Sequence, residues 1–409
     1  MILAHGLGGR SDLPVPLWLA LYAGAAAVLV SFFALTALWK RPKLRGAEAG
    51  RAWPRALERI ADARVTRIAL RLLGLALFAV FLVFAWTGVD DSAKNPAGAW
   101  FYVWFWVGLV PLSVLCGPVW RLVNPLRTLA AIFPGRLPLP RWGFCPAVAG
   151  LVAFLWLELV YPHSDSPRAI AVFVTAYAVV HVVAGAVFGP RWFDRGDGFE
   201  VYSALIAALS PWGRRADGRL VLRNPLDGLR TLERDRGLTP FVLVVLGSTA
   251  FDGLTRLPVW GDLTRDGNRV LLGTAGLAAA IGLTALAYAG AIRLTRPYLR
   301  RSVTGPYDAF APSLVPIMVG YTVAHYFSFA VFEGQRGFGA GVDYTVVSPA
   351  AIAFTQIAGI VAGHVLAVTS AHDRALGVLR NGYAKVGQYP MLAVMVCYTA
   401  VGIALVSGA

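Results

Sequence analysis

The chain has 409 residues, of which 57% are hydrophobic and only 14% are charged. Soluble domains contain about 25% charged residues, so this composition excludes a soluble, fibrous or disordered protein. The net charge of +15 would favour a nucleic-acid partner in a soluble protein, but the basic residues cluster in particular loops, as the positive-inside rule requires of a membrane protein. We therefore expect the lipid bilayer as a partner, and no nucleic acid.

About ten apolar runs are close to the roughly 20 residues that cross a bilayer core. The first run ends at Leu38 and is followed at once by Lys40 and Arg41, which predicts an uncleaved span with its N-terminus outside. The predicted spans cover residues 15–38, 68–88, 100–120, 143–161, 169–189, 239–255, 270–291, 310–332, 347–370 and 390–407. The sequence therefore predicts an all-α polytopic helix bundle over residues 1–409, a single integral membrane domain with both termini outside.

The basic residues test this arrangement, because ten spans assign every lysine and arginine to one side. The segments predicted inside hold 30 of the 37 lysine and arginine residues. These segments are 40–71, 121–141, 190–238, 293–301 and 373–389. Since a wrong number of spans would scramble the asymmetry, it supports a multi-pass protein of the bacterial cytoplasmic membrane, with cytoplasmic loops at 40–67 and 190–238.

Both cytoplasmic loops contain patterns of their own. Residues 52–66 place charged and apolar side chains at helical spacing, which indicates a helix on the inner leaflet or an orientation anchor. The second loop contains FEVYSALIAAL, which is too short to span. It then contains RLVLRNPLDGLRTL, which is similar to RLVNPLRTL at 121–129. Either one Asn-Pro helix start is used twice, or the similarity is coincidental.

Several catalytic classes lack their sequence motifs. No GxxxxGK[ST] occurs, which excludes ATP-driven transport by this chain alone, and no GxSxG, HExxH or dinucleotide-binding GxGxxG supports a serine hydrolase, a zincin or a Rossmann enzyme. Cys116, Cys145 and Cys397 have no metal-type spacing and are expected to be buried thiols.

Ionisable side chains inside a bilayer are costly and therefore indicate function. Glu158, Asp252 and His325 are predicted near the outer ends of the fourth, sixth and eighth spans, and His163 follows the fourth. Carboxylate and imidazole groups together suit a divalent metal and a metal-bound hydroxide. The predicted catalytic residues are thus His325, Asp252 and Glu158, with His163 as a further metal ligand. A satisfied hydrogen-bond network between helices is the alternative.

A second pair of histidines lies toward the inner side. His181 on the fifth span and His364 on the ninth are predicted at similar depths, which permits two imidazoles to hold a haem. No CxxCH sequence occurs, so only a non-covalent haem b is compatible with the chain. Hydrogen bonds to neighbouring helices are the simpler interpretation of both residues.

Over nearly its full length the chain resembles a family of bacterial, mostly actinobacterial, integral membrane proteins that are often labelled fenitrothion hydrolase. The resemblance rests on AHGLGGRSDLPVPLWL, FYVWFWVGLVPLSVL followed by NPLR, AFLWLELVYP, STAFDG, SLVPIMVGYTVAHYFSFAVFEGQ, GHVLAV with AHDRAL, and GQYPMLAVMV. It implies cleavage of an organophosphate or phosphorothioate triester, a hydrophobic small-molecule substrate, and a hydroxide supplied by a divalent metal.

Three classes of function are compatible with the sequence. The first is a membrane-embedded, metal-dependent hydrolase of phosphoric triesters. The second is a secondary transporter or accessory membrane subunit, for which five spans plus five would form inverted repeats. The third is a redox protein that holds haem b or copper. The sequence leaves any protein partner unspecified.

Overall fold

The structure is a computed structural model that describes residues 16–133, 135, 137–339 and 341–407. It is 74% helical with almost no strand, which confirms the predicted all-α helix bundle. The helices fall into two compact units, and the single integral membrane domain stays a prediction. The first unit comprises residues up to 44, 238–329 and from 344 onward, and the second comprises 45–237 and 330–343.

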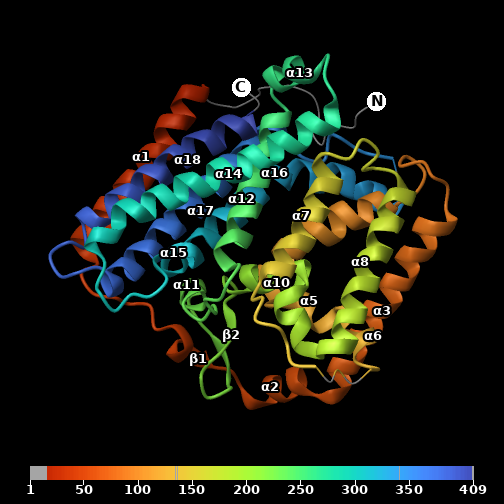
Figure 1. The fold of residues 1–409 in the computed structure, drawn as a ribbon, viewed down its shortest axis with the longest axis horizontal. Helices are drawn as coiled ribbons and strands as arrows, with labels where there is room; N and C mark the ends of the chain where they lie inside the picture. Colours follow the sequence, from red (N-terminus) through yellow and green to blue (C-terminus); the bar gives the residue numbers. More distant parts are fainter. Residues whose placement is uncertain (1–15, 134, 136, 340, 408–409) are drawn as a thin grey trace. The chain divides into compact units, whose positions relative to one another are not determined.

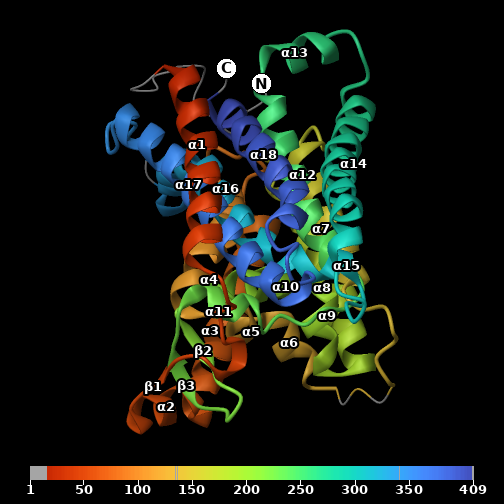
Figure 2. The same cartoon turned by 90° about the vertical axis from the view of Figure 1, so that its left-hand side faces the viewer.

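The first unit contains six of the predicted spans. They are α1 (Leu17–Leu38), α12 (Leu238–Thr255), α14 (Arg269–Thr295), α16 (Val315–Phe332), α17 (Pro349–Val378) and α18 (Tyr389–Ser407). Its short elements are α13 (Pro258–Thr264), η4 (Arg296–Tyr298), α15 (Pro306–Phe310), η5 (Ala311–Leu314) and η7 (Val386–Gln388). α1 packs along α17 and α18 (Figure 1), and α12 along α14 (Figure 2). Ala20, Ala324, Ile360 and Ile403 form a buried core between four of these helices.

Glycines bring α16 and α17 into close contact. A Cβ atom built on Gly320 would lie 2.4 Å from the carbonyl oxygen of Gly359, and one on Gly363 would lie 2.7 Å from that of Pro316. Small residues allow such backbone approach between membrane helices, where packing rather than the hydrophobic effect drives association. The two helices therefore depend on these positions lacking side chains.

We expect Gly320→Leu to destabilise the first unit by roughly 1–3 kcal/mol, because the new side chain must displace a backbone carbonyl. The melting temperature of the detergent-purified protein would measure this. Gly282→Leu on α14 is the control, since a Cβ there meets no described atom within 4 Å. Equal melting temperatures of the two variants would show that the contact is not tight.

The second unit contains the other four predicted spans, formed by α3 (Arg64–Thr87), η2 (Ala99–Val107) with α4 (Leu109–Cys116), α7 (Cys145–Leu159) and α8 (Pro167–Phe188). Its remaining helical elements are η1 (Gly46–Glu48), α2 (Arg55–Asp62), α5 (Val119–Val123), α6 (Pro125–Ala130), η3 (Pro190–Trp192), α9 (Phe193–Gly196), α10 (Gly198–Ala207), α11 (Pro225–Leu229) and η6 (Glu333–Phe338). Its strands are β1 (Arg51–Ala52), β2 (Trp212–Arg214) and β3 (Leu220–Leu222). α3 and α8 run side by side (Figure 1).

Within the described residues, nine helices are long and apolar enough to cross a membrane. The fourth predicted span is the exception, because α7 has only 15 residues, or about 22 Å against a hydrocarbon core of roughly 30 Å. Its two ends nevertheless meet opposite loops of the unit. The amide of Phe144 donates to the carbonyl of Arg236 (2.6 Å), and Ser166 Oγ, beyond the other end, donates to Asp90 Oδ1 (2.8 Å). α7 therefore connects one predicted side with the other.

Segments predicted on the inner side contact one another within each unit. In the second unit β1 pairs antiparallel with β3 in a sheet of order β1-β3-β2, and Arg219 Nε donates to Glu58 Oε2 (2.8 Å). These contacts bring residues of loops 40–67 and 190–238 together. In the first unit, His372 Nε2 donates to the carbonyl of Trp39 (2.9 Å). That this side is cytoplasmic rests on its charge and stays a prediction, and the predicted ends of the chain lie outside the described residues.

The repeated Asn-Pro sequence is a helix start in both places, which confirms the prediction. Asn124 caps α6, and its side-chain oxygen accepts from the amide of Leu126 (3.0 Å). Asn224 caps α11 in the same way, accepting from the amide of Leu226 (3.0 Å). In each case proline occupies the first helical position, where its missing N–H is not needed.

The predicted loop at 190–238 is not simply a loop. FEVYSALIAAL forms most of α10, in which every residue but Ala204 is buried. α10 packs against α4, α5, α7 and α9 inside the second unit. The sequence excluded a span because of length, and length alone does not show that a short apolar helix is internal. Residues 55–62 of the first loop do form a helix, α2, with no buried residue.

Candidate functional site

Two of the predicted site residues come together in the first unit. Asp252 lies one turn before the end of α12, and His325 lies on α16. His325 Nε2 is 2.6 Å from Asp252 Oδ2. Both side chains are buried, and that of His325 is 0% exposed. Of the three residues predicted to share one site, Asp252 and His325 are therefore in contact.

The third member of this site is Arg256, which the sequence analysis counted only as an outer loop residue. Its Nη2 atom lies 2.9 Å from His325 Nε2 and 3.9 Å from Asp252 Oδ2. The signal for it was in the sequence, because an acidic and a basic residue four positions apart share a helical face. The side chain of Arg256 is 20% exposed, so the cation is largely taken out of solvent.

Aromatic rings enclose the histidine. The Tyr321 ring stacks on His325 with centroids 5.7 Å apart and planes at 20°, and Tyr326 meets it edge-on at 4.8 Å. His325 Nδ1 and the Tyr321 hydroxyl have no hydrogen-bond partner among the described residues. A Cβ on Gly253 would lie 3.0 Å from that hydroxyl, so glycine makes room for the phenol.

The shared atom of the site is His325 Nε2, which can hold one proton. With the proton, Nε2 donates to the Asp252 carboxylate; without it, Nε2 accepts from Arg256, whose guanidinium remains charged. Asp252 and Arg256 balance each other's charge, so a proton that arrives changes the charge of the whole site. Such groups buried in a membrane bundle are characteristic of proton relays in pumps and transporters.

Glu158 and His163 lie in the second unit. Glu158 is buried on α7, and its charge interacts with Tyr102 of η2. His163 is exposed in the turn after α7, near Asp90. The pKa of Asp90 is lowered by hydrogen bonds from the Arg168 amide (3.1 Å) and the Ser166 hydroxyl (2.8 Å). Both predicted ligands therefore have surroundings of their own within this unit.

The predicted metal centre gains no support from this geometry. Among residues 16–133, 135, 137–339 and 341–407, no three His, Cys, Asp or Glu side chains are grouped so that they could hold a metal ion. Arg256, a cation, lies beside the Asp252–His325 pair and repels a divalent metal. The pair itself offers only two ligands, fewer than catalytic zinc sites use.

The two histidines predicted for haem each have local partners in their own unit. His181 Nδ1 accepts from the indole N–H of Trp192 (3.0 Å), and its ring lies 4.1 Å from that of Tyr177. His364 donates from Nδ1 to the carbonyl of Ile360 (2.9 Å), while its buried Nε2 has no partner in the described structure. A pair of histidines around one haem stays a prediction, and a Soret band in the purified protein would support it.

A second buried ionic cluster, which the sequence analysis missed, lies in the second unit. Arg127 donates from Nε to Glu200 Oε2 (3.1 Å) and from Nη2 to Asp194 Oδ1 (2.7 Å). Asn124 donates to Glu200 Oε2 (2.9 Å) and to Asp197 Oδ2 (2.8 Å). Since each carboxylate has donors, the cluster is built to hold α6 against α9 and α10.

Comparisons with protein-family models, with curated proteins and with solved structures find no match to this chain.

Proposed function

We propose that the protein is a proton-coupled secondary transporter for an apolar small molecule, acting in the cytoplasmic membrane. The observation that carries the proposal is the buried site of Asp252, His325 and Arg256, in which one proton can move on or off an imidazole held between two opposite charges. A transporter must couple the binding of a proton to a conformational change. Protonation of an imidazole that contacts both members of a buried ion pair changes the charge balance of that pair, which provides such a coupling.

The burial of the site favours transport over hydrolysis. Triester cleavage requires water and substrate at the reacting group, but His325 is 0% exposed and is covered by the rings of Tyr321 and Tyr326. A carrier passes through a closed state in which its proton site reaches neither side, and it exchanges the proton when it opens. The geometry fits the closed state of such a cycle.

A metal-dependent or metal-free hydrolase is the second candidate, favoured by one specific observation. A histidine that donates from one ring nitrogen to a carboxylate, with its other nitrogen unpartnered, has the arrangement of a general base. The resemblance to proteins labelled fenitrothion hydrolase supports the same candidate. It requires an opening of the helices that brings water to His325 Nδ1.

One preparation tests both candidates. The protein is reconstituted in liposomes that contain a pH-sensitive dye, and fenitrothion, which is uncharged, is added outside. We expect the internal pH to change faster than in protein-free liposomes, without release of the nitrophenol product. Release of nitrophenol would favour the hydrolase. Naphthalene serves as a second probe. If fenitrothion and naphthalene both fail to produce proton movement or cleavage, the transporter proposal is overturned.

A matched pair of variants ties the flux to the site. We expect Asp252→Asn to abolish the proton movement, because the amide cannot share the proton with His325. Asp262→Asn on α13 should leave it unchanged, since Asp262 is exposed and forms its ion pair with Arg265 at the surface (2.5 Å). Equal flux in the two variants would exclude the Asp252 site from coupling.

A further inference from the structure

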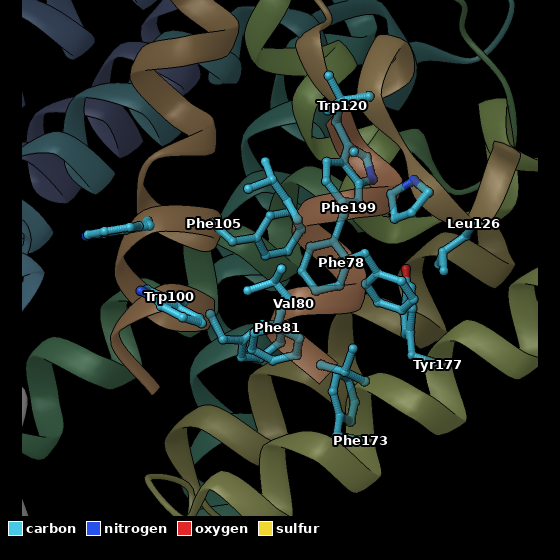
Figure 3. Close-up of a pocket in the computed structure, with 17 residues that line it drawn as sticks. Phe78, Val80, Phe81, Trp100, Phe105, Trp120, Leu126, Phe173, Tyr177 and Phe199 are labelled. Atoms are coloured by element: carbon cyan, nitrogen blue, oxygen red, sulfur yellow. The ribbon is translucent and has the colours of Figure 1, made fainter. Parts of the chain in front are cut away.

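A cavity of about 360 Å³ lies inside the second unit (Figure 3). α3 and η2 form two of its walls, and α8, α10 and the short helices α5 and α6 close the others. Gly74 of α3 lets this wall approach α5, since a Cβ there would lie 1.8 Å from the carbonyl oxygen of Val123. All of these elements belong to one unit, so the cavity is a feature of that unit alone.

Ten of the 17 residues that line the cavity are aromatic, and none is charged. The aromatic residues are Phe78, Phe81, Trp100, Phe101, Trp104, Phe105, Trp120, Phe173, Tyr177 and Phe199. Figure 3 shows the rings of Phe78, Phe105 and Tyr177 close together at this space. Leucine and valine would fill the walls of a general apolar cavity equally well, so this content of rings points to a ligand with aromatic faces.

A π-helix arranges one wall. η2 is a π-helix of nine residues. The π-helical spacing of five residues continues in the hydrogen bond from the Gly108 amide to the carbonyl of Val103 (2.9 Å). Residues four apart lie close to one face of η2, as they do in an α-helix. Phe101 stacks on Phe105 with planes at 17° and centroids 5.9 Å apart. π-helical turns are rare and frequently occur at functional sites.

The polar atoms of the lining side chains are already in use. Trp100 and Trp104 donate their indole N–H groups to the carbonyls of Gly337 (2.8 Å) and Gly334 (3.0 Å). The Tyr177 hydroxyl donates to Asp197 Oδ1 (2.7 Å) and accepts from the amide of Gly198. Trp120 Nε1 lies 3.4 Å from Asp197 Oδ2. A ligand therefore meets ring faces and finds no free side-chain donor in these residues.

The cavity is open at the surface of α3. Leu77 and Val80 line it and are at the same time 62% and 48% exposed. α3 is one of the predicted spans, so these side chains face hydrocarbon in the membrane. A ligand can thus enter from the bilayer, where an uncharged aromatic molecule concentrates.

We propose that this cavity binds a single flat, uncharged aromatic molecule that enters from the membrane. Its volume lies near the lower end of the roughly 300–1,000 Å³ typical of small-molecule pockets, so it suits one small molecule rather than a two-chain lipid. The binding energy comes from apolar burial and from stacking on the rings. This inference does not depend on the proposed transport function.

The test uses anthracene with the full-length protein in nanodiscs, and it measures energy transfer from tryptophan to the probe. We expect a saturable transfer that naphthalene displaces and that hexadecane, an alkane, does not. Phe81→Leu and Phe105→Leu keep the cavity apolar but remove a ring face, so each should weaken anthracene binding by roughly 2- to 10-fold. Phe133→Leu, outside the cavity and 56% exposed, is the matched control.

Two results would overturn the inference. The first is the absence of a saturable signal in the wild-type protein. The second is displacement by hexadecane as effective as that by naphthalene, which would assign the cavity to an acyl chain. Equal melting temperatures of the leucine variants and the wild type would show that a weaker signal reflects binding and not unfolding.

Discussion

We expect Arg127→Met to cost about 3–5 kcal/mol of stability, the largest effect of a single substitution in the second unit. Arg127 is 11% exposed and Glu200 only 2%, so the substitution leaves a buried carboxylate without its cation. The Asn124 amide still donates to Glu200, but one neutral donor does not replace a guanidinium. The melting temperature and the denaturant midpoint of the purified protein would measure the loss.

The loss should depend on pH in a defined direction. Burial raises the pKa of Glu200, and the hydrogen bond and charge of Arg127 oppose that rise. Without Arg127 the folded protein favours a protonated Glu200 more strongly. A group with a raised folded pKa contributes stability below its unfolded pKa, about 4.3 for Glu, and loses it as pH rises through the folded value. The variant should therefore approach wild-type stability in acid and fall behind it near neutral pH.

Arg121→Met is the control for this experiment. Arg121 also pairs with Asp194 (3.3 Å), but its side chain is 55% exposed, and exposed pairs contribute at most about 1 kcal/mol. The double variant Arg127→Met with Glu200→Gln should recover part of the stability, because the amide removes the unpaired charge. Equal losses for Arg121→Met and Arg127→Met would show that the cluster is not a buried ion network.

Much of the fold follows from simple patterns in the sequence. In the part of the chain that the structure describes, nine of the ten predicted spans are helices long enough to cross, and α7 joins the two sets of loops despite its length. Helix starts also follow from the local sequence. Asn124 and Asn224 start helices because an asparagine side chain and a following proline satisfy the first turn whatever lies around them. Both kinds of prediction depend only on neighbours in the chain.

The candidate site could be predicted only in part, because depth along a span is one coordinate of three. Depth suggested that Glu158 joins Asp252 and His325, but depth does not state which way each side chain points or which helices pack together. Within the second unit Glu158 interacts with Tyr102, and that it joins Asp252 and His325 stays a prediction. Arg256 was missed for a related reason. The topology assigned it to an outer loop, although it lies one helical turn from Asp252.

The aromatic cavity was beyond the sequence for a different reason. AWFYVWFWV reads as an ordinary apolar span, and nothing in its composition distinguishes an α-helix from the π-helix of η2. The walls also come from segments more than a hundred residues apart, from Gly74 on α3 to Phe199 on α10. Tertiary packing alone brings these segments together.

The last prediction separates stability from coupling at the Asp252 site. Asp252→Asn removes the carboxylate beside Arg256, and Arg256→Met removes the guanidinium beside Asp252, so each should cost about 3 kcal/mol, toward the lower end for buried pairs because Arg256 is 20% exposed. The double variant carries neither charge and should regain most of the lost stability, as a buried pair replaced by neutral groups commonly does.

Proton movement in liposomes should not return with the stability. His325 in the double variant still has Tyr321 and Tyr326 around it, but no carboxylate remains to share its proton and no guanidinium remains to compete for Nε2. A stable but uncoupled double variant is therefore the result expected of a proton-coupling site. If the double variant regains both stability and flux, the three residues form only a structural ion pair, because charge balance would then be the sole requirement of the bundle at this position.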